Sequence, residues 1–396
     1  MICASAFAQD AKPQFKWYGF VRNYYAFDTR ESSAGTEDLY YYMPKDQKIG
    51  KDGQDLNAGA SFRYAALTSR LGLDVTGYEF DGYKIGAKIE TDFYSGVSGT
   101  TGTATHRLRQ AYVTVTKDGR SWKLGQAWHP MAADLPDIFS LESGAPFGPF
   151  SRTPQATFDG KLSDVVSLTA SAIWQMQYTS TGPAGNSADY IKYSCIPELY
   201  LGLNFKSGNS LVRVGAEMLS IKPRRADAIQ KVSDRLTTFN VFEYGQFKSG
   251  NFTFKEKVTF AQDGSHMNMV GGYGVSDIFS NGSWGYSATR NLSGWATAMY
   301  KSSSRWSPSI LLGYIKNFGT ADPIIGEFWC KNSASSVNQM YRIQPEIVYN
   351  LGKLAFGLEY MMTAVEYGKP DNCYNVVDNL HWVYNNRIQL MVKYTF

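Results

Sequence analysis

Charged side chains recur at two-residue spacing in residues 83–93. Lys84, Lys88, Glu90 and Asp92 alternate with apolar residues, of which Ile89 is typical. Successive side chains of a β-strand point to opposite faces, so this pattern predicts a strand with one apolar and one charged face. Charged side chains fixed on the water-filled side of a channel can select solutes by the sign of their charge. The pattern therefore indicates a wall that contacts both lipid and water.

Further basic residues extend this charged face. Arg107 and Arg109 are two residues apart on the next predicted strand, and Arg70 lies on the preceding one. We expect a basic pore wall of Arg70, Lys88, Arg107 and Arg109, with Glu90 and Asp92 as its acidic members. If both arginines face inward, Gln110 faces outward, which suits a subunit interface better than lipid. The alternative is that all these residues are solvated wall residues without a special task.

Residues 130–152 form a long loop that follows the strand ending at Trp128. This segment, here called the constriction loop, carries Asp134, Asp137 and Glu142 among Pro, Gly and Phe. In a wide barrel such a loop can fold back into the lumen. We expect its acids to face the basic wall across a narrow passage, where opposed charges create a transverse field.

Composition favours a membrane β-barrel. The chain has 396 residues, a mean hydropathy of −0.31 and 15 % aromatic residues. No segment approaches the roughly 18 consecutive apolar residues that a membrane helix needs. In a membrane barrel, apolar lipid-facing residues alternate with polar lumen-facing residues. The mean hydropathy of the chain therefore does not reveal that the barrel lies in a membrane.

Alternating strands of ten to sixteen residues recur along the whole chain, joined alternately by short polar turns and long loops. The predicted strands are 15–29, 59–76, 83–93, 106–116, 122–128, 153–162, 165–178, 191–205, 211–221, 236–247, 251–262, 284–300, 306–317, 339–349, 354–366 and 385–396. An even number of strands with short turns at one end is typical of bacterial outer-membrane barrels. We predict an all-β fold, a transmembrane antiparallel barrel of about 16 strands, because a closed sheet satisfies every backbone group in lipid.

Both chain ends fit export to an outer membrane. Ala6-Phe7-Ala8 matches the small-residue pattern of a signal-peptide cleavage site, so residues 1–8 are predicted to be a signal-peptide remnant and 9–396 a single barrel. The last residue, Phe396, closes an alternating strand, as the recognition signal of barrel proteins does.

The cysteines and histidines carry no metal or catalytic motif. No CxxC, HExxH or GxSxG pattern exists, so we expect no metal, no cofactor and no enzymatic activity. Cys330 and Cys373 fall in predicted outer loops and are expected to form a disulfide, whereas Cys195 is expected to face lipid. His129, beside the long loop, is the one histidine worth testing for catalysis. The alternatives to a pore are a barrel hydrolase and a surface adhesin.

Four segments with recognisable motifs follow one another in the first third of the chain: 69–77 (SRLGLDVTG), 88–93 (KIETDF), 107–113 (RLRQAYV) and 124–130 (LGQAWHP). Together they resemble the DcaP-like porins, a family of Gram-negative outer-membrane channels. The resemblance implies a sixteen-stranded homotrimer with an inward-folded third loop, which passes small hydrophilic, often anionic, solutes. As further partners we expect outer-membrane lipids and no nucleic acid. Members of the family commonly carry an N-terminal coiled coil, and we expect none before the first strand of this chain. From the arginines we predict a weak preference for anions.

Overall fold

The chain forms a closed antiparallel β-barrel. The computed structural model describes residues 12–35, 40–66, 68–94, 104–227, 229–302, 305–331 and 334–396. The predicted signal remnant lies outside these residues. The barrel strands are β1 (Gln14–Asp28), β4 (Ser61–Ala65), β5 (Arg70–Phe80), β6 (Tyr83–Tyr94), β7 (Thr105–Lys117), β8 (Arg120–Trp128), β9 (Arg152–Lys161), β10 (Val166–Ile173), β13 (Glu198–Ser207), β14 (Ser210–Ile221), β15 (Leu236–Ser249), β16 (Phe252–Gln262), β18 (Trp284–Tyr300), β19 (Trp306–Thr320), β21 (Val337–Leu351), β22 (Leu354–Pro370) and β23 (Val376–Thr395).

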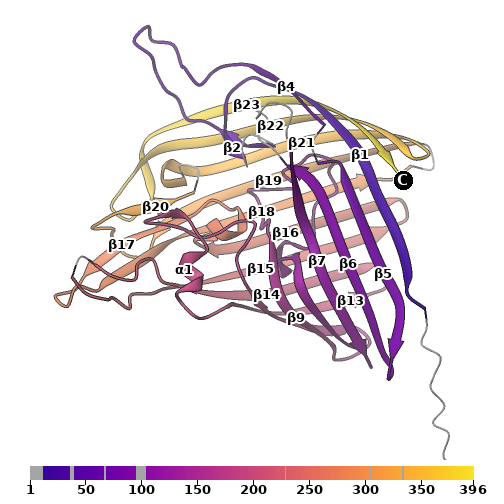
Figure 1. Cartoon of the computed structure of the whole chain (residues 1–396). Helices are drawn as coiled ribbons and strands as arrows, with labels where there is room; N and C mark the ends of the chain where they lie inside the picture. The colour runs from indigo at the N-terminus through magenta and orange to yellow at the C-terminus, as the bar shows by residue number, and fades with distance from the viewer. Residues whose placement is uncertain are drawn as a thin grey trace, which may run out of the picture.

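Closure joins the first and last strands. β1 pairs with β23 from Phe20↔Thr395 to Asp28↔Arg387. On its other side β1 pairs with both β4 and β5, which occupy successive parts of one barrel position. Counted in this way, the described residues contribute sixteen strands around the barrel (Figure 1). The predicted fold class and strand count are therefore confirmed.

Alternation along each strand separates an apolar outside from a polar inside. On β23, Ile388 and Leu390 are 52 % and 49 % exposed, whereas Arg387 and Gln389 are 2 % and 4 % exposed. Apolar residues on the outer face and polar ones within are the pattern of a transmembrane barrel. In the described part of the chain no helix has the length and apolar character needed to cross a membrane.

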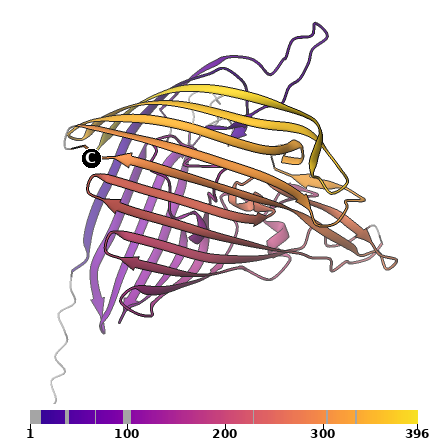
Figure 2. The ribbon, with the colours of Figure 1, turned by 180° about the vertical axis from the view of Figure 1, so that it is seen from behind.

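Shorter elements gather in the loops. They are η1 (Pro130–Ala132), α1 (Asp189–Lys192), η2 (Gly264–Met267), η3 (Ala334–Ser336), β2 (Ser32–Gly35), β3 (Tyr40–Pro44), β11 (Thr181–Gly182), β12 (Gly185–Asn186), β17 (Gly272–Ile278) and β20 (Phe328–Cys330). β17 pairs with β18 and β20, and so extends the sheet. Both views place β17 and β20 at the end of the barrel opposite the C-terminus (Figures 1 and 2).

Two predicted strands begin at clearly different residues in the structure. The strand expected over 191–205 begins only at Glu198, because α1 and a turn precede it. Cys195 lies in that turn with φ +58 and is exposed, so it is not a residue of a lipid-facing strand. The last strand begins at Val376 rather than near 385.

Candidate functional site

A cavity of about 330 Å³ lies between one part of the barrel wall and the constriction loop. Strands β1, β5, β6, β7 and β9 contribute the wall, and residues 135–143 contribute the other side. Its charged lining is mostly basic. The charged residues that line it are Arg22, Arg70, Arg107, Arg109, Arg152 and Glu90. These five arginines are called the arginine face below.

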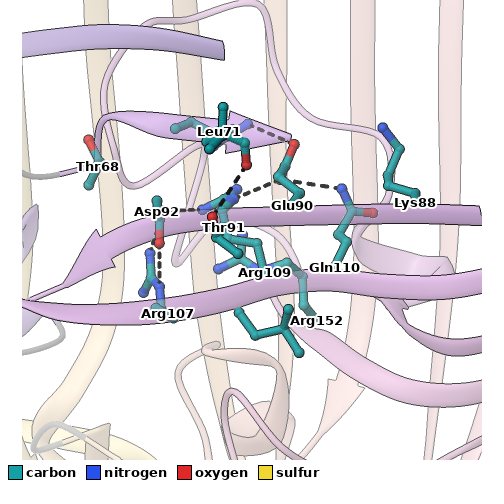
Figure 3. A network of polar contacts seen from close by, with 12 residues as sticks. Thr68, Leu71, Lys88, Glu90, Thr91, Asp92, Arg107, Arg109, Gln110 and Arg152 are labelled. Carbon is teal, nitrogen blue, oxygen red and sulfur yellow. Dashed lines mark hydrogen bonds and ion pairs between the residues drawn. The ribbon is translucent and has the colours of Figure 1, made fainter. Parts of the chain in front are cut away.

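Two arginines of β7 bind two carboxylates of β6 (Figure 3). Nε and Nη2 of Arg107 donate to the two oxygens of Asp92 at 2.8 and 2.9 Å. Nη1 of Arg109 donates to Asp92 Oδ2 at 2.7 Å, and its Nε donates to Glu90 Oε1 at 2.8 Å. Bidentate pairs between guanidinium and carboxylate groups fix geometry as well as charge. The network therefore holds both arginines in place at the cavity.

A β-bulge explains the direction of Gln110. The β6–β7 register runs from Glu90↔Gln110 to Thr91↔Leu108, which leaves Arg109 as the extra residue. A bulge interrupts the two-residue alternation of side chains. Gln110 therefore lines the cavity with Arg109, and its Nε2 lies 3.4 Å from Glu90 Oε1. The expectation that Gln110 faces outward was wrong.

The other two predicted wall residues differ in position. Arg70 lines the cavity, and its Nη1 lies 3.6 Å from Glu90 Oε2. Lys88 is not among the lining residues. Its Nζ lies 2.6 Å from Asp74 Oδ1 and donates to the Tyr18 hydroxyl at 2.9 Å.

Arg22 and Arg152 belong to the site but were not predicted. Arg22 Nη2 donates to Thr68 Oγ1 at 2.9 Å, and the Arg152 guanidinium lies 4.7 Å from the Trp128 ring centroid. Among the buried atoms without a hydrogen-bond partner are Nε of Arg22, Nε of Arg70 and Nη1 of Arg152. The alternation of β1 could have identified Arg22, but Arg152 is the last residue of the irregular segment 130–152, to which no alternation applies.

The three acids of the constriction loop bind basic residues of a different part of the wall. Asp134 lies 3.2 Å from Arg213 on β14, and Asp137 lies 2.5 Å from Lys255 on β16. Glu142 lies 3.8 Å from Arg342 on β21. The expectation that these acids face Arg70, Lys88, Arg107 and Arg109 was wrong. Their charges are compensated elsewhere, and the arginine face retains an excess of positive charge.

Further contacts hold the loop against the inner wall. The Tyr24 hydroxyl donates to the Phe139 carbonyl at 2.6 Å, and the Phe139 amide donates to Glu346 at 3.0 Å. Lys257 Nζ donates to the carbonyls of Met131 and Asp134 at 2.8 and 2.7 Å. These partners come from β1, β16 and β21, so the loop is bound on several sides within the barrel.

The structure also shows the surroundings of Cys330, Cys373 and His129. Cys330 and Cys373 are free thiols, so the predicted disulfide is not present in the structure. Their segments meet through other contacts, since the Phe328 and Tyr374 rings stack with centroids 3.6 Å apart. His129 is fully buried and contacts the Glu198 carboxylate through its Nε2.

No protein-family model and no curated protein sequence matches the chain. Solved structures do match it. The outer membrane channel DcaP of Acinetobacter baumannii shares 20 % identity, with a TM-score of 0.69 over 97 % of both chains. An anion-selective porin from Comamonas acidovorans has a TM-score of 0.59 at 10 % identity, over 97 % of this chain and 100 % of its own. OmpT of Vibrio cholerae has a TM-score of 0.55 at 13 % identity, over 98 % and 99 %. These likenesses establish a shared fold.

Proposed function

We propose that the chain is an outer-membrane porin through which small hydrophilic solutes diffuse passively, with a preference for anions. The barrel has an apolar outer face and a polar interior, and its fold is shared with outer-membrane channels. A wall of sixteen strands is wide enough to enclose an aqueous channel. In this proposal the cavity at the arginine face is the narrowest part of the passage.

The charge balance of the cavity is the observation that carries the preference for anions. The arginine face presents five guanidinium groups, and the carboxylates paired with it are Glu90 and Asp92. Five positive and two negative groups leave an excess of three positive charges. The loop acids do not reduce this excess, because Asp134, Asp137 and Glu142 pair with other bases.

The cavity also suits small solutes. Its 330 Å³ would hold roughly ten water molecules at about 30 Å³ each, or one small organic anion with part of its hydration. The guanidinium groups of Arg22, Arg70 and Arg152, which line the cavity, would bind carboxylate or phosphate oxygens transiently. Such binding must stay weak, because conduction requires the solute to leave again.

Planar bilayer recordings test the proposal. Purified protein in a KCl gradient should give a reversal potential whose sign reports higher permeability for chloride than for potassium. Conductance steps in groups of three would support the homotrimer that the family resemblance implies. A cation-selective channel would contradict the assignment of the arginine face, and the absence of any conductance would contradict the porin function itself.

A further inference from the structure

Four buried residues from four parts of the chain meet beneath the constriction loop. His129 directly follows β8 and precedes η1, Glu198 begins β13, Glu217 lies on β14 and His266 lies in η2. Each of the four is at most 2 % exposed. The ligand atoms of His129, Glu198 and Glu217 all lie within 4.8 Å of one another. Imidazole and carboxylate groups gathered in this way form the donor set that Zn²⁺ and similar divalent ions bind.

The distances at His266 match those of a metal site. Its Nε2 lies 3.1 Å from Glu217 Oε1 and 3.7 Å from Glu198 Oε2. Ligands about 2.0–2.1 Å from a tetrahedral Zn²⁺ are separated from one another by about 3.3 Å. One ion could therefore contact His266 together with either carboxylate, and Glu198 and Glu217 have ligand atoms within 4.8 Å of each other.

Unsatisfied atoms supply a second, independent observation. Glu198 Oε2 is buried without a hydrogen bond, although it lies within the cluster, and so is His266 Nδ1. A buried carboxylate oxygen without a partner is costly unless a cation or donor reaches it. An ion between Glu198 and Glu217 would remove this cost.

The remaining neighbours orient the proposed ligands. The Met131 amide donates to His129 Nδ1 at 3.2 Å, which places the His129 proton on Nε2, facing Glu198 Oε1. His129 would then hold Glu198 in position as a metal ligand and would not bind the ion itself. Asp263, three residues before His266, has a buried Oδ1 without a partner.

We propose that Glu198, Glu217 and His266 bind one divalent transition-metal ion, with His129 as a positioning residue. The ion would fasten β13, β14 and η2 to the base of the constriction loop. That base is closed by hydrogen bonds from the His129 amide to the Ser151 carbonyl at 3.1 Å and from the Phe150 amide to the Met267 carbonyl at 2.8 Å. The site would thus stabilise the loop from outside the cavity.

The test uses the full chain, folded in detergent and purified without a histidine tag or chelator. Its metal content is measured by mass spectrometry, and its affinity is measured by titration with Zn²⁺. We expect one Zn²⁺ per chain, with binding at least tenfold weaker in Glu217→Gln and His266→Gln. His381→Gln is the matched control, because His381 contacts Asp46 away from the cluster, and its affinity should equal that of the wild type.

Folding of each variant is checked by the slower migration of the barrel on gels after heating. Should the variants fail to fold, the visible absorption of wild-type protein loaded with Co²⁺ decides the question, since a nitrogen–oxygen site of low coordination gives characteristic intense bands. Wild-type protein that shows no saturable Zn²⁺ binding, or equal binding in wild type and folded His266→Gln, would overturn the proposal, as would a Co²⁺ spectrum of the hydrated ion.

Discussion

Asp137 Oδ1 on the constriction loop lies 2.5 Å from Lys255 Nζ on β16. Both side chains are mostly buried, with 20 % and 16 % of their surfaces exposed. The pair binds the loop to a different part of the wall from the arginine face. It therefore neutralises a loop carboxylate and holds the loop in position at the same time.

Loss of this pair should loosen the loop. In Asp137→Asn, the Lys255 ammonium loses its charged partner while it stays part-buried, which we expect to cost about 1–3 kcal/mol of loop stability. Single-channel recordings should show more current noise and more brief closures than the wild type. Asp164→Asn is the control, because Asp164 pairs with Lys161 at 2.7 Å but is 95 % exposed. Equal noise in the two variants would contradict the role of Asp137.

Removal of one positive charge from the arginine face should weaken the preference for anions. Arg152 is 2 % exposed, and its Nη1 has no hydrogen-bond partner. Arg152→Gln should lower the ratio of chloride to potassium permeability two- to fivefold, since about 1 kcal/mol of electrostatic energy changes such a ratio by roughly a factor of 5.

The reversal potential in a KCl gradient measures this ratio. Arg235→Gln provides the matched control, because Arg235 donates to the Ser194 carbonyl and does not line the cavity. An unchanged ratio in Arg152→Gln would show that the arginine face does not set the selectivity.

The barrel could be predicted from the sequence because its signal is local. Lipid-facing and lumen-facing residues alternate along each strand, as in residues 388–391, so both the strand and its orientation follow from a few neighbouring residues. Boundaries failed where another local structure intervened, as α1 does before β13. The two-residue alternation also failed to predict the side-chain directions near Arg109. The β-bulge there adds one residue, which reverses the alternation without changing the composition.

The partners of the constriction loop could not be predicted in the same way. Asp137 and Lys255 are 118 residues apart, and Arg342 contacts the Ala145 carbonyl across 197 residues. Only the path of the loop through the barrel decides which wall its acids reach. The predicted residues Arg70, Arg107, Arg109 and Glu90 do meet at one cavity, whereas the loop acids are directed elsewhere.

Stability should depend on pH through Lys331, which follows β20 at the loop end of the barrel. Burial lowers the pKa of Lys331 to about 7, although the Asp263 carboxylate acts in the opposite direction. Between about pH 7 and its ordinary pKa near 10.4, the unfolded chain binds one proton more than the folded chain. The free energy of unfolding should therefore rise with pH across this interval. Below about pH 7, Lys331 should make no pH-dependent contribution to it.

Thermal unfolding of wild type and Lys331→Met from pH 6 to pH 10 checks this expectation. The wild-type midpoint should rise by a few degrees more than that of the variant, because methionine has no proton to lose. Lys48→Met, at an exposed loop lysine, should follow the wild type. Parallel curves for wild type and Lys331→Met would contradict the assigned pKa.

Gly313 on β19 should be essential for docking of the constriction loop. A Cβ at this position would lie 2.6 Å from Cγ of Phe147, whose ring is fully buried against the wall. Gly313→Ala should therefore displace Phe147 at a cost of about 1–3 kcal/mol and increase both current noise and cleavage of the loop by added protease. Gly59→Ala is the control, since a Cβ there would have no atom within 4 Å. Wild-type noise and protease resistance in Gly313→Ala would show that the Phe147 contact does not hold the loop.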